Sequence, residues 1–177
     1  KVVLVGEECV YPFLETPEAQ QWPQWLVPDA ENPASDADLA GFDCEFNQDV
    51  ESAGTQTPDA SLRDGIRAEE DMLYIFTSGT TGLPKAARYS HMRWMTSGDV
   101  MEVTLETGTH DVFYCCLPLY HGAAATSVVS TALASGSSVF IRRKFSASRF
   151  WSDVREHNVT VFQYVGGICR YLLNRPV

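Results

Sequence analysis

The sequence has no apolar run that could cross a membrane. A membrane-spanning helix needs about 18 or more consecutive apolar residues, and no run in these 177 residues approaches that length. The opening stretch KVVLVGEECV turns acidic too early for a secretory signal peptide. With 45% hydrophobic residues, the chain has enough apolar material for a core. These features predict a globular protein.

Closely spaced cysteine pairs are also missing. The cysteines are five in number and include no C-x-x-C pattern, which argues against a disulfide framework and a zinc site. We expect reduced, mostly buried thiols in a cytoplasmic protein. The cysteines are Cys9, Cys44, Cys115, Cys116 and Cys169.

Charge is distributed unevenly around a net value of -10. Residues 29–71 carry 13 acidic and two basic side chains, whereas residues 72–177 carry 6 acidic and 10 basic ones. The mild basic excess of the second part tolerates a polyanionic ligand but is weak support for one. No nucleic acid partner is expected.

The hydrophobic pattern divides the chain at the same place. Residues 1–71 indicate an N-terminal strand at 2–5 and an acidic, proline-rich excursion, with a brief strand at 25–27 and helical turns near 35–40 and 59–65. In residues 72–177, strands at 72–77, 112–116, 138–142 and 159–164 alternate with helices at 90–106, 122–134, 146–157 and 167–174. This alternation predicts a layered α/β fold with a largely parallel sheet flanked by helices.

Helix ends can be assigned from single residues. Ser90 is a candidate N-cap for the first of these helices. Gly108 and Gly136 lie just beyond two helices, where a left-handed terminating residue is expected. Ile168, Leu172 and Leu173 recur at helical spacing and are expected to be core residues.

The segment TSGTTGLPK at 77–85 is built almost entirely from small and hydroxyl-bearing residues. Its glycines let the backbone approach a ligand closely, so that successive amide N–H groups can point at one anion. Four hydroxyls add donors and Lys85 adds a mobile positive charge. This chemistry suits a triphosphate.

Two familiar phosphate-binding patterns are absent from this segment. The G-x-x-x-x-G-K-[ST] spacing fails, because Pro84 precedes Lys85 and Ala86 follows it, and there is no G-x-G-x-x-G fingerprint. A flexible linker is the alternative, but it would not predict a strong strand before the segment and an apolar strand start after it.

Three stretches together resemble one family. YIFTSGTTGLPKAA (74–87) resembles the phosphate-binding loop of the adenylate-forming superfamily, which includes acyl-CoA synthetases, luciferases and peptide-synthetase adenylation domains. CLPLYHGAAA (116–125) is similar to its second core motif. IRRKFSASRFWSDVREHNVTVFQYVGGICRYLLNRP (141–176) resembles the fatty acid transport protein and very-long-chain acyl-CoA synthetase branch. The resemblance covers residues 72–176 and implies part of an N-terminal, AMP-binding domain.

The resemblance implies an ATP-dependent, AMP-forming acid–thiol ligase. A fatty acid carboxylate would attack the α-phosphate of ATP to give an acyl-adenylate and pyrophosphate, and coenzyme A would then displace AMP. The loop would hold the β- and γ-phosphates, with Thr77 as a Mg²⁺ ligand and Lys85 among the catalytic residues. The implied phosphate-loop residues are Thr77, Ser78, Gly79, Thr80, Thr81, Gly82 and Lys85.

The same resemblance implies an acid-binding site. Tyr120 and His121 would lie beside the acyl carboxylate, with His121 as a second catalytic residue; the alternative is a structural histidine satisfied by backbone groups. Gly166 and Gly167 would shape the wall of the acyl tunnel. The branch carries an acidic residue where Gly167 stands, and this departure bears on the polarity of the tunnel.

The basic run Arg142, Arg143 and Lys144 has three interpretations. It could meet a membrane surface, bind the 3′-phosphate of coenzyme A, or form a solvated rim. Three charges are too few for stable membrane binding alone, which favours the rim. Peripheral membrane association stays open, as does oligomeric state. Trp94 and Trp151 are expected to be packing residues.

Several elements of the superfamily are not found after Tyr164. They are an adenine-binding Y-G-x-T-E type motif, an aspartate for the ribose, a hinge and a lysine on a mobile C-terminal domain. We therefore expect an internal segment of a long-chain or very-long-chain acyl-CoA synthetase, inactive by itself. The rival functions are an aryl or bile acid CoA ligase, a lipid transport or binding protein with a vestigial loop, and a non-catalytic scaffold.

Overall fold

The computed structural model describes residues 2–29, 41–77 and 83–174. The chain forms two compact units, Lys1–Leu62 and Arg63–Val177. The change in composition at residue 72 therefore falls inside the second unit. No helix in the described residues is long and apolar enough to cross a membrane.

The first unit is a small parallel sheet with short helices. Strand β1 (Val3–Gly6) pairs with β2 (Gln24–Val27), which pairs with β3 (Cys44–Glu45). The strands expected at 2–5 and 25–27 are confirmed; the turn expected at 35–40 lies outside the described residues. The acidic excursion also contains a helix, α3, that the sequence pattern did not indicate. The helices and turns are η1 (Glu7–Cys9), α1 (Val10–Leu14), η2 (Ala19–Gln21), α3 (Phe46–Ser52) and η3 (Ala60–Arg63).

The second unit opens with an antiparallel hairpin of β4 (Asp71–Thr77) and β5 (Lys85–Ser90). A strand at 72–77 was expected, but as part of a parallel sheet, and β5 was not expected as its partner. The physical reason is the short connection. Antiparallel strands can be joined by a few residues, whereas parallel strands need a crossover of a dozen or more.

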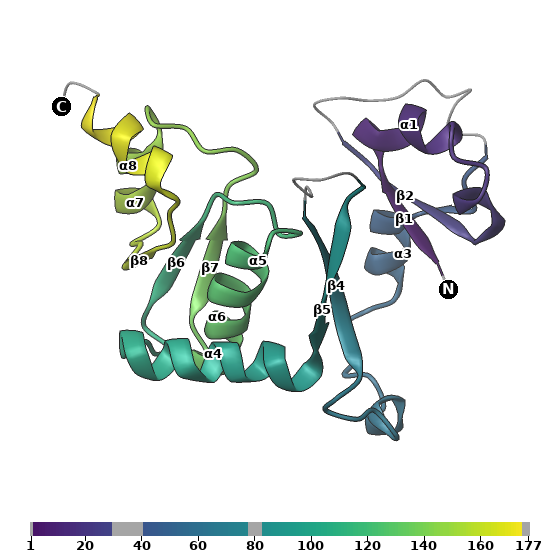
Figure 1. Cartoon of the computed structure of the whole chain (residues 1–177), viewed down its shortest axis with the longest axis horizontal. Helices are drawn as coiled ribbons and strands as arrows, with labels where there is room; N and C mark the ends of the chain where they lie inside the picture. The colour runs from purple at the N-terminus through teal and green to yellow at the C-terminus, as the bar shows by residue number, and fades with distance from the viewer. Residues whose placement is uncertain (1, 30–40, 78–82, 175–177) are drawn as a thin grey trace. The chain divides into compact units, whose positions relative to one another are not determined.

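The parallel sheet predicted for residues 72–177 is present and has three strands in the order β7-β6-β8. Strand β6 (Val112–Cys115) is central, between β7 (Ser138–Ile141) and β8 (Val161–Phe162) (Figure 1). This confirms the α/β class, in which parallel strands alternate with the helices that cover them.

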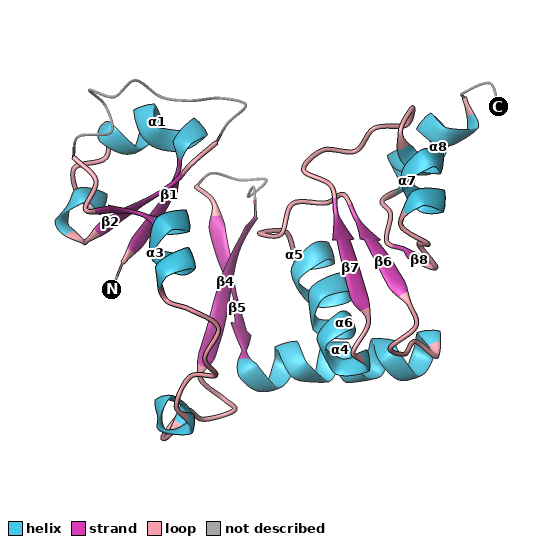
Figure 2. Ribbon diagram, turned by 180° about the vertical axis from the view of Figure 1, so that it is seen from behind, coloured by secondary structure: helices cyan, strands magenta, loops and turns pink. Residues whose placement is uncertain are grey.

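Alternate residues of β6 face two different helical layers, as strand geometry requires. On one face, Phe113 and Cys115 pack against the helix that runs through α5 (Gly122–Ala124), η4 (Ala125–Ser130) and α6 (Thr131–Ser135). On the other face, Tyr114 and Cys116 pack against α7 (Phe150–Glu156) and α8 (Gly166–Leu173). Figure 2 shows helices on both sides of the strands β6 and β7. All four residues of this alternation are buried.

The long helix α4 (His91–Leu105) begins as expected and ends differently. The Ser90 side chain accepts a hydrogen bond from Arg93 N, which confirms the N-cap. Gly136 is left-handed at the end of α6, with φ 70°, which is also confirmed. Gly108 is not left-handed; instead Glu106 ends α4 with φ 53°. The prediction for Gly108 was wrong because the helix stops two residues earlier.

Two burial predictions hold only in part. Ile168 is buried and Leu172 packs against the same cluster, but Leu173 is 85% exposed and is not part of that cluster. The five cysteines are free, but burial holds only for Cys115 and Cys116; Cys9 is exposed, and Cys44 and Cys169 are half-buried.

Candidate functional site

The β4–β5 hairpin brings two predicted phosphate-loop residues together at its end. Thr77 and Lys85 are directly opposed in the strand register. The Thr77 hydroxyl donates a hydrogen bond to the Lys85 carbonyl over 3.3 Å. Both side chains are exposed, so the Lys85 ammonium is free to reach an anion between the strands. The other predicted loop residues, Ser78, Gly79, Thr80, Thr81 and Gly82, lie outside the described residues.

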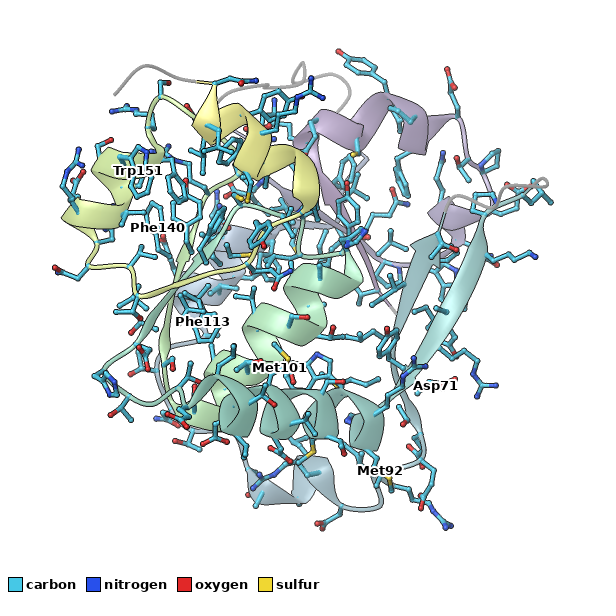
Figure 3. All side chains as sticks on the ribbon, turned by 60° about the vertical axis from the view of Figure 1, so that its left-hand side comes forward. Asp71, Met92, Met101, Phe113, Phe140 and Trp151 are labelled. Carbon is cyan, nitrogen blue, oxygen red and sulfur yellow. The ribbon has the colours of Figure 1, made fainter. Side chains whose placement is uncertain are left out.

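The opposite end of the hairpin is fixed by a charged cluster. Arg88 Nε and the Tyr74 hydroxyl each donate to Asp71 Oδ2 over 2.7 Å, and Figure 3 labels Asp71 on this hairpin. The hydrogen bonds from Tyr74 and then Arg88 hold the pKa of Asp71 below its usual value. Asp71 in turn raises the pKa of Tyr74. The cluster links the start of β4 to β5 through Arg88.

His121 is the N-cap of the helix that follows β6. Its Nδ1 accepts a hydrogen bond from Ala123 N over 3.2 Å. Because Nδ1 is an acceptor, the neutral ring carries its proton on Nε2. Within the described residues no partner occupies Nε2, and the side chain is exposed. The histidine thus caps the helix through Nδ1, and it also has a free Nε2–H that can donate to an anion.

The segment before His121 leaves Tyr120 at the surface. His121 N donates to Pro118 O over 2.9 Å, which closes a turn after β6. Tyr120 projects from this turn and is 79% exposed. Its side chain is available to line a site but is not packed against the protein.

The first helical residue after His121 lies against the hairpin. A Cβ at Gly122 would lie 3.8 Å from Ile75 Cδ1 and 3.9 Å from the Tyr89 hydroxyl. This contact places the LPLYHG segment beside the strands that carry Thr77 and Lys85. Neither Ile75 nor Tyr89 was identified from the sequence as a site residue. They belong to no recognisable motif, and their place beside Gly122 is visible only in the structure.

The sheet edge brings the two predicted acid-binding segments to the same end. Tyr120 and His121 follow the C-terminal end of β6, and Gly166 and Gly167 follow that of its parallel neighbour β8. Ligands of open α/β sheets bind at this end of the strands. Gly166 has no atom within 4 Å of an added Cβ, and Gly167 has only Tyr171 Cε2 at 4.0 Å. Gly166 therefore faces open space, and a side chain at Gly167 would meet the Tyr171 ring. Figure 1 shows the Thr77–Lys85 end of the hairpin at this same end of the unit.

A groove of about 620 Å³ lies between α4 and η4. Met92, Val100 and Met101 of α4 contribute its apolar surface, and Figure 3 labels Met92 and Met101 on this helix. Thr126 and Ser127 form the facing wall, and the Thr126 hydroxyl donates to Gly122 O over 2.6 Å. The groove was not expected from the sequence, because helix–helix packing creates it.

The basic run beyond β7 is not a uniform solvated rim. Arg142 donates from Nη2 to Asp153 Oδ1 over 2.6 Å and from Nε to Oδ2 over 2.8 Å. The side chains are 31% and 4% exposed, respectively. The guanidinium holds the pKa of Asp153 below its usual range. Arg142 is therefore a structural ion-pair partner, which corrects the interpretation for that residue, whereas Arg143 and Lys144 are exposed.

The described residues do not by themselves build a metal site. No group of three His, Cys, Asp or Glu side chains that could hold a metal ion occurs among them. Thr77 has a hydroxyl oxygen at the end of β4 that fits a single hard-cation contact, because Mg²⁺ binds proteins through few oxygens and keeps several from water and phosphate. Its role as a ligand stays a prediction.

Curated proteins are similar in sequence to most of this chain. The chain is 43% identical over 150 residues to a medium/long-chain-fatty-acid–CoA ligase from Mycobacterium tuberculosis, which covers 83% of this chain and 25% of the relative. It is 46% identical over 123 residues to long-chain fatty acid transport protein 1 from Bos taurus, covering 70% of this chain and 19% of the relative. The chain thus spans a quarter or less of the length of these two proteins.

Solved structures share the fold. The o-succinylbenzoate CoA synthetase from Bacillus subtilis, in complex with an acyl-adenylate intermediate, superposes with a TM-score of 0.70 at 16% identity over 99% of this chain and 51% of that one. The same enzyme in complex with ATP and magnesium ion gives a TM-score of 0.68 at 18% identity over 94% and 34% of the two chains.

The family itself follows from a match over nearly the whole chain. The AMP-binding enzyme family matches residues 7–177, which includes the hairpin, the segment around His121 and α8. The chain belongs to the family of AMP-binding enzymes.

Proposed function

We propose that this chain is a segment of an ATP-dependent long-chain or very-long-chain fatty acyl-CoA synthetase. The observation that carries the proposal is the short space between Gly122 and the side chains of Ile75 and Tyr89, which a Cβ would fill, since it puts the turn that bears His121 beside the hairpin that ends in Thr77 and Lys85. A phosphate-binding end and an acid-binding end are both needed for adenylation. The names of the two curated relatives support a fatty acid as the substrate.

Each residue has a separate part in the proposed reaction. Lys85 and the small residues before it hold the β- and γ-phosphates of ATP, and Mg²⁺ supplies further neutralisation of the phosphate oxygens. His121 donates its Nε2–H to the fatty acid carboxylate and orients it toward the α-phosphate. No general base is needed, because a carboxylate is already ionised at neutral pH. Positioning and charge neutralisation are the main contributions a protein makes to such a displacement.

The groove between α4 and η4 supports an apolar substrate. It begins four residues beyond Gly122, and its lining is mostly methionine, valine and small hydroxyl residues. A volume of about 620 Å³ falls in the range of small-molecule sites. Coenzyme A would enter after adenylation.

The proposal is tested by measuring the pyrophosphate that the full-length protein releases from ATP. With ATP, magnesium and a long-chain fatty acid, we expect release that depends on the acid, and acyl-CoA formation once coenzyme A is added. The 177-residue chain alone should form no acyl-CoA. Acid-independent or absent release from the full-length protein would contradict the proposal.

A second candidate is a fatty acid transport or lipid-binding function with a vestigial loop. It is favoured by the names of several relatives, such as long-chain fatty acid transport proteins 1 and 3. The same assay distinguishes the two, because a vestigial loop predicts fatty acid binding without ATP turnover. Competition by aryl and bile acids tests whether the acid is a fatty acid at all.

A further inference from the structure

The helix that follows His121 is interrupted by a π-helical turn. Residues Ala125–Ser130 (η4) lie between the α-helical segments α5 and α6. Such turns are rare and accommodate an extra residue within an α-helix, frequently at functional sites. One residue of an α-helix corresponds to a rotation of about 100°. The turn therefore sets the direction of the helix start, and of His121, relative to the buried α6.

One residue of α4 binds both ends of this turn. Trp94 Nε1 donates to Ala125 O, the first carbonyl of η4, over 2.8 Å. The Ser130 hydroxyl, at the last residue of η4, donates to Trp94 O over 2.6 Å. Trp94 thus spans the turn with its side chain at one end and its main chain at the other.

A glycine lets α4 come close enough for these bonds. A Cβ at Gly98 would lie 2.5 Å from Ser130 O and 2.8 Å from Ser130 C, distances that no side chain tolerates. Gly98 is the buried residue of α4. The two backbones are therefore in direct contact one turn beyond Trp94.

The direction of His121 depends on how the helix segments on the two sides of η4 are turned relative to each other. Ala124 of α5, Val128 of η4 and Ala132 of α6 are all buried in the cluster around Phe113, so the helix contacts the core on both sides of the turn. His121 and Tyr120 are exposed at the other end. A change in the pitch of η4 would turn α5 relative to α6, and would therefore move Ala124 within the core and His121 with it.

We propose that Trp94 is a positioning residue: it holds η4 in its π-helical form and so directs His121 toward the acid carboxylate. The inference rests on the proposed function of His121. Trp94 does not touch the substrate. Its effect on catalysis passes through the helix, because its two hydrogen bonds lie at opposite ends of the turn.

The test is a double-mutant cycle in the full-length protein. Trp94→Phe keeps an aromatic ring and removes the indole N–H, and His121→Ala removes the imidazole. Acid-dependent ATP–pyrophosphate exchange should fall roughly tenfold in Trp94→Phe, with the KM for ATP changed by less than about twofold. In the His121→Ala background, Trp94→Phe should have almost no further effect, because the group that it positions is gone.

Trp151→Phe is the matched control, because Trp151 lies 56% exposed on α7 and is not bonded to η4. It should leave exchange activity unchanged. If Trp94→Phe folds poorly, the double-mutant cycle is repeated with Ser130→Ala, which removes the hydrogen bond at the other end of the turn. It should show the same dependence on His121.

The inference would be overturned if the loss of exchange activity in the double variant equalled the product of the losses in the two single variants. It would also be overturned if Trp94→Phe had normal exchange activity. A silent His121→Ala change would overturn it as well. These outcomes differ from failure of the proposed function, in which the unsubstituted protein shows no acid-dependent exchange. In that case the structural part is still tested by hydrogen exchange: the Trp94 indole N–H should exchange far more slowly than that of Trp151, and equal rates would overturn the bond.

Discussion

The Tyr114 hydroxyl in β6 donates a hydrogen bond of 3.0 Å to Asp153 Oδ2 in α7. Both residues are buried, and Arg142, just beyond β7, binds the same carboxylate through two nitrogens. Burial, and then Asp153, raises the pKa of Tyr114 to about 12, so the phenol remains a donor at all physiological pH values. The bond ties the central strand to the helix on its far face.

Tyr114→Phe should destabilise the second unit without changing its shape. The ring contacts with Phe140, Phe150 and Phe162 are kept, while a hydrogen bond to a buried charge is lost. Such bonds contribute about 1.5–3 kcal/mol. Urea unfolding followed by circular dichroism measures the loss, and Tyr74→Phe, at an exposed hydrogen bond in the hairpin, should cost clearly less. An unchanged midpoint for Tyr114→Phe would show that the bond is not formed in solution.

Asp153 predicts how stability depends on pH. Its pKa is lowered in the folded state, first by the bonds from Arg142, so its contribution is fully present above the unfolded value of about 3.9. The contribution is lost as pH falls through the still lower folded pKa. We expect unfolding free energy to decrease between about pH 5 and pH 2, and to decrease less in Asp153→Asn. Parallel pH profiles for the two proteins would contradict this.

Lys85→Ala tests the phosphate-binding role of the hairpin. Lys85 is exposed and its ammonium makes no ion pair with a described residue, so its removal should leave the melting temperature within about 2 °C. Acid-dependent pyrophosphate exchange in the full-length protein should fall at least about a hundredfold, as for loss of a preorganised charge at a reacting phosphate. Lys144→Ala, at another exposed lysine, is the control. Equal losses of stability and activity in Lys85→Ala would argue against a specific role.

Gly98→Ala should be strongly destabilising although the change adds one methyl group. The new Cβ would lie 2.5 Å from a main-chain oxygen, and backbone cannot rotate away as a side chain can. Overpacking of this kind costs about 1–3 kcal/mol. Thermal unfolding measures it, with Gly166→Ala as the control because an added Cβ there meets no atom within 4 Å. If both changes are neutral, α4 does not lie against η4 as closely as the structure shows.

The elements that the sequence predicted well are those whose signals are local. The alternation of apolar residues in β6, the Ser90 N-cap and the left-handed Gly136 each depend on a few neighbours in the chain. The small-residue segment at 77–85 and the LPLYHG segment carry the predictions of phosphate and carboxylate binding, which stay predictions and depend on composition rather than on packing. The α/β class followed from the order of these elements.

The contacts between distant residues could not be predicted in this way. Nothing near Trp94 in the chain indicates a bond to Ala125, and the run at 142–144 does not show that Arg142 is the member bound to Asp153. The π-helical turn is likewise invisible in the spacing of 122–135, because its extra residue is stabilised from α4.

The sequence by itself predicted which residues would bind phosphate and carboxylate, and it determined most of the segments that form strands and helices, since these properties belong to side chains and their immediate neighbours. Tertiary structure decided where those residues lie. Gly122 reaches Ile75 and Tyr89 only because the hairpin and the helix after β6 are packed in one unit. Contact between segments distant in the chain depends on the packing of whole elements, and no short stretch of sequence contains that information.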